Sequence, residues 1–387
     1  MTAKLGVAII MGSHAETIRL APVVWALNAM GVDPTIINTT NHLYDTGMNI
    51  HGDIFDLRKE LPTDPYHKSM VTEVASMIFQ IENTFRHHNQ SVVFTAGGSN
   101  AAMAAALVAK ESHMSLVRLN AGSRGFYRHG NQATNNIMID HTSNILFPST
   151  KNAFKNLSKE GLTEHALIFQ EGSTTVDVIK HCEDLYQGSP EVDAIKEYET
   201  RHGSNDFTES KYNLVVLSGV TEYGDEVLGF CPPKKKILNA LRGMGKPIII
   251  SDKHYSQVNE RHLRTIPPQE YLRFFFWEKN ADLIITDSPW VQEEACILNV
   301  PCITLSNDTE RPETIDIGAN TLVDPVKDDL GKRWLQQACA GRQRWTHPYG
   351  SGTTGEAIVE IVYDLLGNYP RISSMEIHSG ADLGDIF

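Results

Sequence analysis

The chain has 387 residues, of which 41% are apolar and 21% are charged, and its formal net charge at pH 7 is −13. This length suits one or two globular domains of about 150–200 residues, and no apolar run approaches the roughly 20 residues that a membrane span requires. The acidic balance argues against unspecific binding to nucleic acid or to an anionic membrane surface.

The cysteines and histidines indicate whether the compartment is reducing and whether the chain has a metal-binding site. Five scattered cysteines form no C-x-x-C pair, which argues against a disulfide framework or a zinc site and favours a reducing cytoplasm. The 16 histidines include no H-E-x-x-H or other ligand spacing, so we expect no metal site. The N-terminal KLGVAIIMGS is too short for a secretory signal and is predicted to be a first buried strand.

Strand and helix patterns alternate over the first 180 residues. Apolar runs rich in β-branched residues predict strands, and amphipathic segments between them predict helices. The predicted strands are KLGVAII (4–10), PTIINTT (34–40), SVVFTAG (91–97), SLVRLNAG (115–122) and NILFPS (144–149), and the predicted helices cover 16–31, 68–88, 99–112 and a segment from about Thr150. This alternation predicts a doubly wound parallel sheet.

A polar segment over 183–211 is predicted to hold a helix and a linker, because it is poor in β-branched residues. The alternation then resumes in a second α/β unit of similar size. Its elements are YNLVVLSGV, PPKKKILNALRGMG, KPIIISD, QEYLRFFFWEKN, ADLIITDS, WVQEEACILN, VPCITLSN and NTLVDP. A last amphipathic helix, GTTGEAIVEIVYDLLG, is a candidate to return to the first domain.

The predicted fold is therefore α/β, with two Rossmann-like, doubly wound parallel-sheet domains that face a central cleft. We place the N-terminal domain at 1–182, a linker at 183–210, the C-terminal domain at 211–352, and the last helix and tail at 353–387. Ligands of such folds bind at the carboxyl ends of the strands, so the loops that follow the predicted strands are the candidate sites.

The first of these loops is GSHAE, Gly12 to Glu16. Ser13 can cap the following helix, whose free N-terminus offers N–H groups and a partial positive charge. A neutral imidazole at His14 can take a proton from an attacking hydroxyl. The alternative is a polar residue in an ordinary helix-start loop.

Two further loops follow the middle strands. TAGGSNAA, Thr95 to Ala102, contains Gly98 and Ser99, and its glycines indicate either a ligand-binding turn or merely close backbone packing. The segment from Arg118 to Asn136 is rich in Asn, Arg and Gly and contains no carboxylate. It can hydrogen-bond sugar hydroxyls or phosphates, but it supplies no obvious acid or base.

The fourth loop, TDSPWVQEEA, follows a strand of the second unit. Carboxylates near a helix N-terminus are electrostatically favoured, so Glu293 has a structural explanation, whereas Glu294 is well placed to accept hydrogen bonds from the hydroxyls of a ribose. In the later TERPE, Arg311 lies between carboxylates. An arginine fork suits a phosphate, and an ion pair between loops is the alternative.

Together these motifs resemble the non-hydrolysing UDP-N-acetylglucosamine 2-epimerases, which have the GT-B fold of many glycosyltransferases. GSHAETIRLAPVV resembles the family's G-T-R-P-E-A-I-K-x-A-P, and TNH at Thr40 to His42 resembles its T-x-Q-H. FPSTKNAFKNLSKEG resembles F-A-P-T-E-x-A-x-x-N-L-x-x-E-G, and EGSTTVD resembles T-G-N-T-V-x-D. The most specific match is LIITDSPWVQEEACILNVPCITLSNDTERPE, to L-x-L-T-D-S-G-G-x-Q-E-E-A-x-x-x-G-x-P-x-L-x-x-R-D-x-T-E-R-P-E.

The resemblance implies a UDP-sugar site on the C-terminal domain and a sugar or acceptor site on the N-terminal domain. It implies Ser288 near the diphosphate, Glu294 on the ribose, and Phe274 where the family contacts uracil. The expected donor-binding residues are Arg19, Phe274, Ser288, Trp290, Gln292, Glu293, Glu294, Thr309, Glu310, Arg311 and Glu313. The expected sugar or acceptor pocket comprises Gly98, Ser99, Asn120, Arg124 and Glu222.

The family's catalytic motifs do not carry over. Its H-G-D is Ala96-Gly97-Gly98 here, its H-V-E-A-G is Arg118 to Gly122 with Asn120 in place of the glutamate, and its P-E-E-x-N-R is Asn131 to Asn136. Its G-H-R-R-E-N is Gly219 to Gly224, without the histidine, and the arginine of the opening motif is His14. As the resemblance implies, 2-epimerisation eliminates UDP across C1–C2 and adds it back, which requires positioned bases.

Because these carboxylates are missing, the sequence favours an inverting glycosyltransferase that moves a sugar from a UDP-sugar to an acceptor hydroxyl, with no obligatory cofactor. His14 is the expected base, with Glu16 as a second catalytic candidate, and Asp45, Glu16 or Glu222 to orient it. The alternatives are an epimerase or hydrolase of the same family, or a catalytically silent nucleotide-sugar binder.

The acceptor and the donor sugar stay open. A glycan, a small molecule or a modified DNA base are the acceptors considered, the last only if FYRHGN and PPKKK line a basic groove. A homodimer is the family's common assembly. Pro289 removes one N–H from the phosphate-binding end, and Trp290 places a ring where the family has glycine. The ring either stacks on the ligand and narrows the site or packs between the domains.

Overall fold

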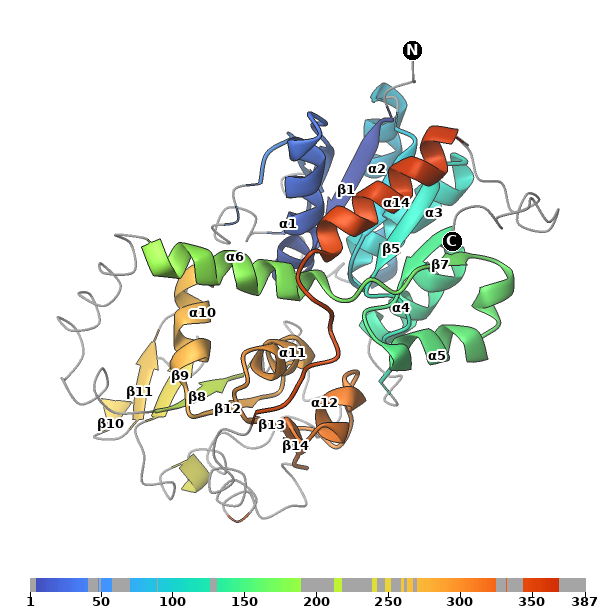
Figure 1. The fold of residues 1–387 in the computed structure, drawn as a ribbon. Helices are drawn as coiled ribbons and strands as arrows, with labels where there is room; N and C mark the ends of the chain where they lie inside the picture. Colours follow the sequence, from blue (N-terminus) through green and yellow to red (C-terminus); the bar gives the residue numbers. More distant parts are fainter. Residues whose placement is uncertain are drawn as a thin grey trace. The chain divides into compact units, whose positions relative to one another are not determined.

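In the computed structural model the chain divides into two compact units, Met1–Val178 with Tyr349–Phe387, and Ile179–Pro348 (Figure 1). The structure describes residues 5–40, 48, 50–57, 70–88, 90–125, 131–188, 212–217, 239–241, 248–251, 259–260, 263–266, 270–324, 332 and 344–368. Every structural statement below concerns these residues.

The first unit is built on a seven-stranded parallel sheet with the order β3-β2-β1-β4-β5-β6-β7. The strands are β1 (Val7–Met11), β2 (Thr35–Asn38), β3 (Asp53–Asp56), β4 (Val92–Thr95), β5 (Ser115–Leu119), β6 (Ile145–Phe147) and β7 (Leu167–Ile168). The helices are α1 (His14–Ala29), α2 (Met70–His87), α3 (Asn100–Glu111), α4 (Asn131–Thr142), α5 (Lys151–Lys159) and α14 (Thr354–Asn368), with a 3-10 turn at Leu162–Glu164. Helix α6 (Thr174–Gly188) begins in this unit and continues into the second, which starts at Ile179.

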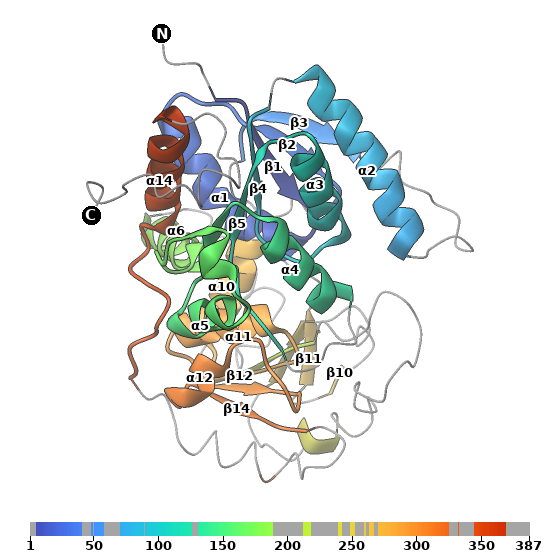
Figure 2. The ribbon, with the colours of Figure 1, turned by 90° about the vertical axis from the view of Figure 1, so that its right-hand side faces the viewer.

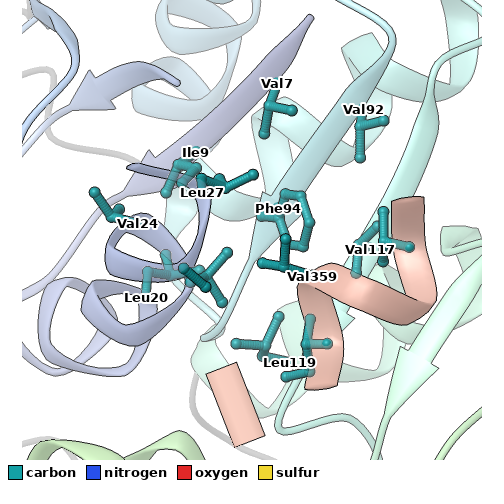
Figure 3. Packing of buried hydrophobic residues seen from close by; sticks show 14 of the residues in the cluster. Val7, Ile9, Leu20, Val24, Leu27, Val92, Phe94, Val117, Leu119 and Val359 are labelled. Carbon is teal, nitrogen blue, oxygen red and sulfur yellow. The ribbon is translucent and has the colours of Figure 1, made fainter. Parts of the chain in front are cut away.

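Alternate residues of β1 supply two cores, one on each face of this sheet, because side chains of a strand point to opposite faces. Val7 and Ile9 pack with α1 and α14, as the side chains of Figure 3 show. Ala8 and Ile10 pack with α2 and α3 on the opposite face. Figure 2 shows α14 and α2 on opposite sides of the strands. The sheet is therefore covered on both faces, as parallel sheets require.

The close packing of α14 on α1 depends on a glycine. A Cβ atom at Gly355 would lie 2.6 Å from Cβ of Pro22 and 2.8 Å from its carbonyl carbon. We expect Gly355→Ala to lower the free energy of unfolding by about 1–3 kcal/mol, because the helices must separate to admit the methyl group. Chemical denaturation followed by circular dichroism measures this.

Gly367 is the matched control for this substitution, since it lies on the same helix. A Cβ there meets nothing within 4 Å, and alanine is the better helix former. Gly367→Ala should leave stability unchanged or raise it by up to about 1 kcal/mol. Equal losses of stability in both variants would show that alanine destabilises helix α14 itself, and that the contact of Gly355 with α1 is not the cause.

The second unit has a seven-stranded sheet with the order β10-β11-β9-β8-β12-β13-β14. Its strands are β8 (Asn213–Val216), β9 (Ile248–Ser251), β10 (Asn259–Glu260), β11 (Leu263–Ile266), β12 (Leu283–Thr286), β13 (Cys302–Thr304) and β14 (Asn320–Leu322), and its helices include α10 (Tyr271–Asn280), α11 (Pro289–Ile297) and α12 (Pro312–Asp316). All pairings are parallel except that of β10 with β11.

The predicted α/β class with two doubly wound sheets is thus confirmed, and several details differ. The segment from Arg118 to Asn136 was expected to be a loop, but α4 begins at Asn131. Strands β3, β7 and β11 and the antiparallel edge strand β10 were also not expected. Among the described helices, none has the length and apolarity needed to cross a membrane.

Candidate functional site

At the carboxyl end of β1, the buried carboxylate of Glu16 joins two loops. The Ser13 hydroxyl caps α1 by accepting from the Glu16 N–H at 3.3 Å. One carboxylate oxygen of Glu16 accepts from the Gly12 N–H at 2.9 Å and from the Ser99 hydroxyl at 2.8 Å, and the other accepts from the Ser99 N–H at 3.0 Å. These three bonds hold the loop after β1 against the loop after β4.

His14, the other expected catalytic residue, is the first residue of α1 and is half-buried. Arg19 lies on the same helix and is only 8% exposed. The imidazole of His14 thus lies at the N-terminus of α1, where the helix dipole favours a negatively charged ligand or a developing negative charge. The arrangement can therefore support proton transfer at His14.

The loop after β4 has no room for side chains at its two glycines. A Cβ at Gly97 would clash with the carboxylate of Glu16. A Cβ at Gly98 would lie 2.5 Å from the main-chain oxygen of Gln132 and 2.6 Å from Oδ1 of Asn136. Ser99 caps α3 through its hydroxyl. The glycines thus serve close packing, and position 98 cannot take a larger residue without a shift of α4.

A guanidinium group fills the space beneath this loop. Arg118, on β5, is 1% exposed. Its Nη1 donates to the main-chain oxygen of Gly97, its Nη2 to Oδ1 of Asn136 at 2.7 Å, and its Nε to Oδ1 of Asp140 at 3.1 Å. Arg118 therefore ties strand β5 and helix α4 to the loop that carries Gly98.

Asp140 extends this network to the loop after β5. Its Oδ2 accepts from the Gly122 N–H at 2.9 Å and pairs with Arg124 at 2.7 Å. Arg124 also makes a bidentate pair with Glu160, at 2.8 and 2.9 Å. Burial disfavours its charge, but the bonds to Glu160 and Asp140 prevail and raise the pKa of Arg124. Burial opposes ionisation of Glu160 as well, yet Arg124 lowers the pKa of that carboxyl.

Asn120, where the resembling family has a glutamate, adopts a left-handed backbone conformation with φ of 55°. Asparagine tolerates this conformation better than most residues. Its Oδ1 accepts hydrogen bonds from the hydroxyls of Ser123 at 3.2 Å and Ser149 at 3.0 Å. The Asn120 side chain thus helps to hold the loop after β5. Arg124 belongs to the same loop.

In the second unit, helix α11 begins with Pro289 after Ser288, whose side chain does not cap the helix. Gln292, one turn later, donates to the hydroxyl of Thr314 at 2.6 Å and accepts from the hydroxyl of Thr309 at 2.7 Å. Since all three residues are buried, Gln292 and Thr309 act as interior supports of the loop before α12.

Arg311 and Glu293 form a buried ion pair at 2.7 Å, with side-chain exposures of 2% and 0%. Arg311 also donates to the main-chain oxygen of Glu310, while its N–H donates to the Thr309 hydroxyl. Glu310 and Glu313 are half-buried. The described contacts of Arg311 thus match the ion-pair alternative of the sequence analysis.

Trp290 packs against helix α10. Its ring stacks on Tyr271, with centroids 5.8 Å apart and planes 21° apart, and is tilted against Phe274 at 6.2 Å. Trp290 is half-buried, whereas Tyr271 is 0% and Phe274 8% exposed. These contacts lie within the second unit, so the indole packs on its own unit's aromatic helix, at the position of the expected uracil contact.

Glu294 is fully buried and accepts a hydrogen bond from the hydroxyl of Tyr271. A second buried carboxyl, Glu278 on α10, lies in hydrogen-bonding contact with it. Burial, and then the charge of Glu294, raises the pKa of Tyr271 well above its ordinary value. The phenol is therefore a permanent donor to Glu294.

Three side chains of these networks were not expected from the sequence. Asp140 and Glu278 lie on helices and belong to no recognised motif, and Tyr271 is the first residue of the segment YLRF that contains the expected uracil contact, Phe274. A spacing signal exists for Tyr271 and Glu278, seven residues apart on one helix face. Four further predictions fall outside the described residues: Asp45, Glu222, and the segments PPKKK and FYRHGN. The exception is Asn131, the last residue of FYRHGN. The described residues include no group of three or more His, Cys, Asp or Glu that could hold a metal ion.

Comparisons with known proteins place this geometry in context. A sequence profile described as UDP-N-acetylglucosamine 2-epimerase matches residues 26–363. The chain is 34% identical over 374 residues to the UDP-N-acetylglucosamine 2-epimerase of Methanocaldococcus jannaschii, an alignment that covers 92% of this chain and 98% of that relative.

Solved structures agree in fold. The crystal structure of the Methanocaldococcus jannaschii UDP-GlcNAc 2-epimerase in complex with UDP-GlcNAc and UDP is 30% identical, with a TM-score of 0.76, and the match covers 93% of this chain and 100% of that chain. The Neisseria meningitidis UDP-GlcNAc 2-epimerase bound to UDP-GlcNAc has a TM-score of 0.81 at 21% identity, with the same coverage.

Proposed function

Because the chain belongs to the UDP-N-acetylglucosamine 2-epimerase family and has the GT-B fold, we propose that it binds a UDP-sugar and acts on the sugar as a 2-epimerase. The observation that carries this proposal is the 34% identity to a 2-epimerase along 92% of the chain. The relatives favour this alternative over the inverting glycosyltransferase that the sequence analysis preferred.

We propose that the nucleotide binds on the second unit, along the start of α11. The helix N-terminus at Ser288 and Pro289 faces the diphosphate, and proline is tolerated there because the first N–H of a helix has no internal partner. The carboxylate of Glu294 accepts the ribose hydroxyls. Glu294 has no exposed surface, so covering side chains must move, and Trp290 is the most exposed of the three stacked rings.

The sugar side requires a different proton-transfer set from the one that the family resemblance implies. Positions 98 and 120 carry no carboxylate, and Gly98 has no space for one. Arg118 and Asp140 are committed to a buried network. We propose His14 as the residue that moves the C2 proton, because it is titratable, half-buried and next to a helix N-terminus.

Substitution of His14 by alanine tests this role. We expect kcat for the UDP-sugar reaction to fall about 100-fold or more, the usual contribution of a positioned acid or base, while the affinity for UDP changes little. His165→Ala, an exposed histidine of the same unit, is the control and should leave kcat unchanged. An unaltered kcat in the His14 variant would remove this residue from the mechanism.

The reaction itself is tested in heavy water with UDP-N-acetylglucosamine, by proton NMR of the sugar. A 2-epimerase exchanges the C2 proton with solvent, so deuterium at C2 and the signals of the 2-epimer are the expected result. UDP binding without exchange at C2 contradicts the epimerase proposal.

A glycosyltransferase is the second candidate, favoured by one observation. Among the described residues that follow strands β1, β4 and β5, His14 is the only histidine, and an imidazole suits deprotonation of an acceptor hydroxyl in one in-line displacement. In that case the sugar is transferred to an added acceptor and UDP is released, while the C2 proton of the sugar does not exchange for deuterium.

A further inference from the structure

Two carboxyl groups share the interior of the second unit. Glu278 on α10 and Glu294 on α11 both have an exposed fraction of 0%. Within the described part of the chain, no N–H or O–H group donates to either carboxyl oxygen of Glu278. The group in hydrogen-bonding contact with it is the carboxyl of Glu294. Two acceptors can bond to each other only if one of them holds a proton.

The position of Glu278 on its helix is consistent with this contact. Tyr271 and Glu278 are seven residues apart, which is about two turns of an α-helix, so both side chains lie on one face of α10. Tyr271 donates its hydroxyl to Oε1 of Glu294. Helix α10 therefore presents two groups to a single carboxylate of α11.

The surroundings favour one negative charge and not two. Within the described part of the chain, the titratable groups that interact with the pair are Cys182 of α6, Tyr271 of α10 and Cys302 of β13. All are neutral or acidic, and the neighbouring Lys279 pairs with Glu183 at 2.8 Å. Burial, and then the charge of Glu294, raises the pKa of Glu278 well above its ordinary value. A buried pair of carboxylates with both charges would be strongly unfavourable.

We propose that Glu278 is a positioning residue that stays protonated and donates to Glu294, so that the pair carries a single negative charge. Glu278 and Tyr271 together orient the carboxylate of Glu294. The inference rests on the proposed function, in which Glu294 accepts the ribose hydroxyls of a UDP-sugar.

UDP affinity separates this role from simple packing. Calorimetric titration with UDP should give Glu278→Gln a Kd within about threefold of wild type, because an amide N–H can donate from the same place. Glu278→Met removes the donor, and its Kd should rise about 10–100-fold, the contribution of a hydrogen bond to a charged group. The matched control is Glu270→Gln, an exposed residue just before the same helix, which should bind UDP as wild type does.

The pH dependence of stability gives a second readout. A glutamate in an unfolded chain has a pKa of about 4.3, so the folded protein holds more protons than the unfolded chain above that pH. The contribution of Glu278 to stability is therefore full below that pKa and is lost as pH rises through the raised pKa of the folded state. Glu278→Gln should remove this loss, whereas Glu270→Gln should retain it.

Infrared difference spectroscopy observes the proton directly and does not depend on UDP. At pH 8, wild type minus Glu278→Gln should contain the C=O band of a protonated carboxyl group, shifted in heavy water, and wild type minus Glu270→Gln should not. Absence of the band, or a Glu278→Met variant that binds UDP like wild type, overturns the proposal. If wild type binds no UDP at any pH while the band is present, the proposed function fails instead, and with it the link to ribose.

Discussion

Replacement of Arg311 by methionine is expected to lower the free energy of unfolding of the second unit by about 3–5 kcal/mol. Removal of one partner from a buried ion pair leaves the other charge in the interior without its counterion. Here Glu293 is 0% exposed and its carboxylate lies 2.7 Å from the guanidinium. The loop from Thr309 to Thr314 also loses one of its anchors to α11, while the bonds to Gln292 remain, so UDP affinity should fall together with stability.

Urea denaturation, followed by tryptophan fluorescence, measures the effect. Arg273→Met is the matched control, because Arg273 is an exposed arginine on a helix of the same unit, and it should change stability by no more than about 0.5 kcal/mol. The double variant Arg311→Met with Glu293→Met should recover part of the loss, since an apolar pair can replace a buried ion pair. A single variant as stable as wild type would show that the pair contributes nothing net.

Arg118→Met is expected to lower the free energy of unfolding of the first unit by about 3 kcal/mol or more. The guanidinium is 1% exposed and contacts Gly97, Asn136 and Asp140, so its removal leaves buried acceptors unsatisfied. Asp140 keeps its pair with Arg124, which limits the loss. Because Arg118 holds the loop of Gly98, turnover of the UDP-sugar should also fall.

The stability of this variant is best measured by hydrogen exchange, which resolves α4 and β5 from the second unit. Arg86→Met is the control, because Arg86 pairs with Glu82 on the surface of α2 with a side-chain exposure of 72%. Surface pairs contribute little, so its protection pattern should match wild type. Loss of protection confined to α4, with β5 unchanged, would contradict the expected role of Arg118 as a link between both elements.

The alternation of strands and helices could be predicted from the sequence because it is a local property. Val7 to Met11 is a continuous buried strand, and both faces of it enter cores. Helix α4 was missed for a physical reason. Its buried face carries Asn135, Asn136 and Asp140, which bind Arg118 and main-chain groups, so the helix lacks the apolar period by which helices are recognised.

The site was less accessible to sequence reasoning because its contacts join distant segments. Ser99 is 83 residues from Glu16, and Tyr271 is 23 residues from Glu294. The motif around Glu294 predicted a nucleotide-binding wall, but no local pattern indicates that Gln292 and Arg311 turn inward and support it. The preference for a glycosyltransferase rested on the missing motif residues, such as the carboxylates absent at Gly98 and Asn120, whereas the 34% identity over 374 residues favours a 2-epimerase.

The buried thiols of the second unit have a practical consequence. Cys182, Cys296 and Cys302 are free and buried, and burial raises the pKa of Cys302 to about 12. Only a thiolate reacts with alkylating reagents, so at neutral pH each of these three side chains is protected until its surroundings open. Site-resolved alkylation, read by mass spectrometry, therefore times the opening of helix α6, helix α11 and strand β13 separately, with labels that the chain already carries.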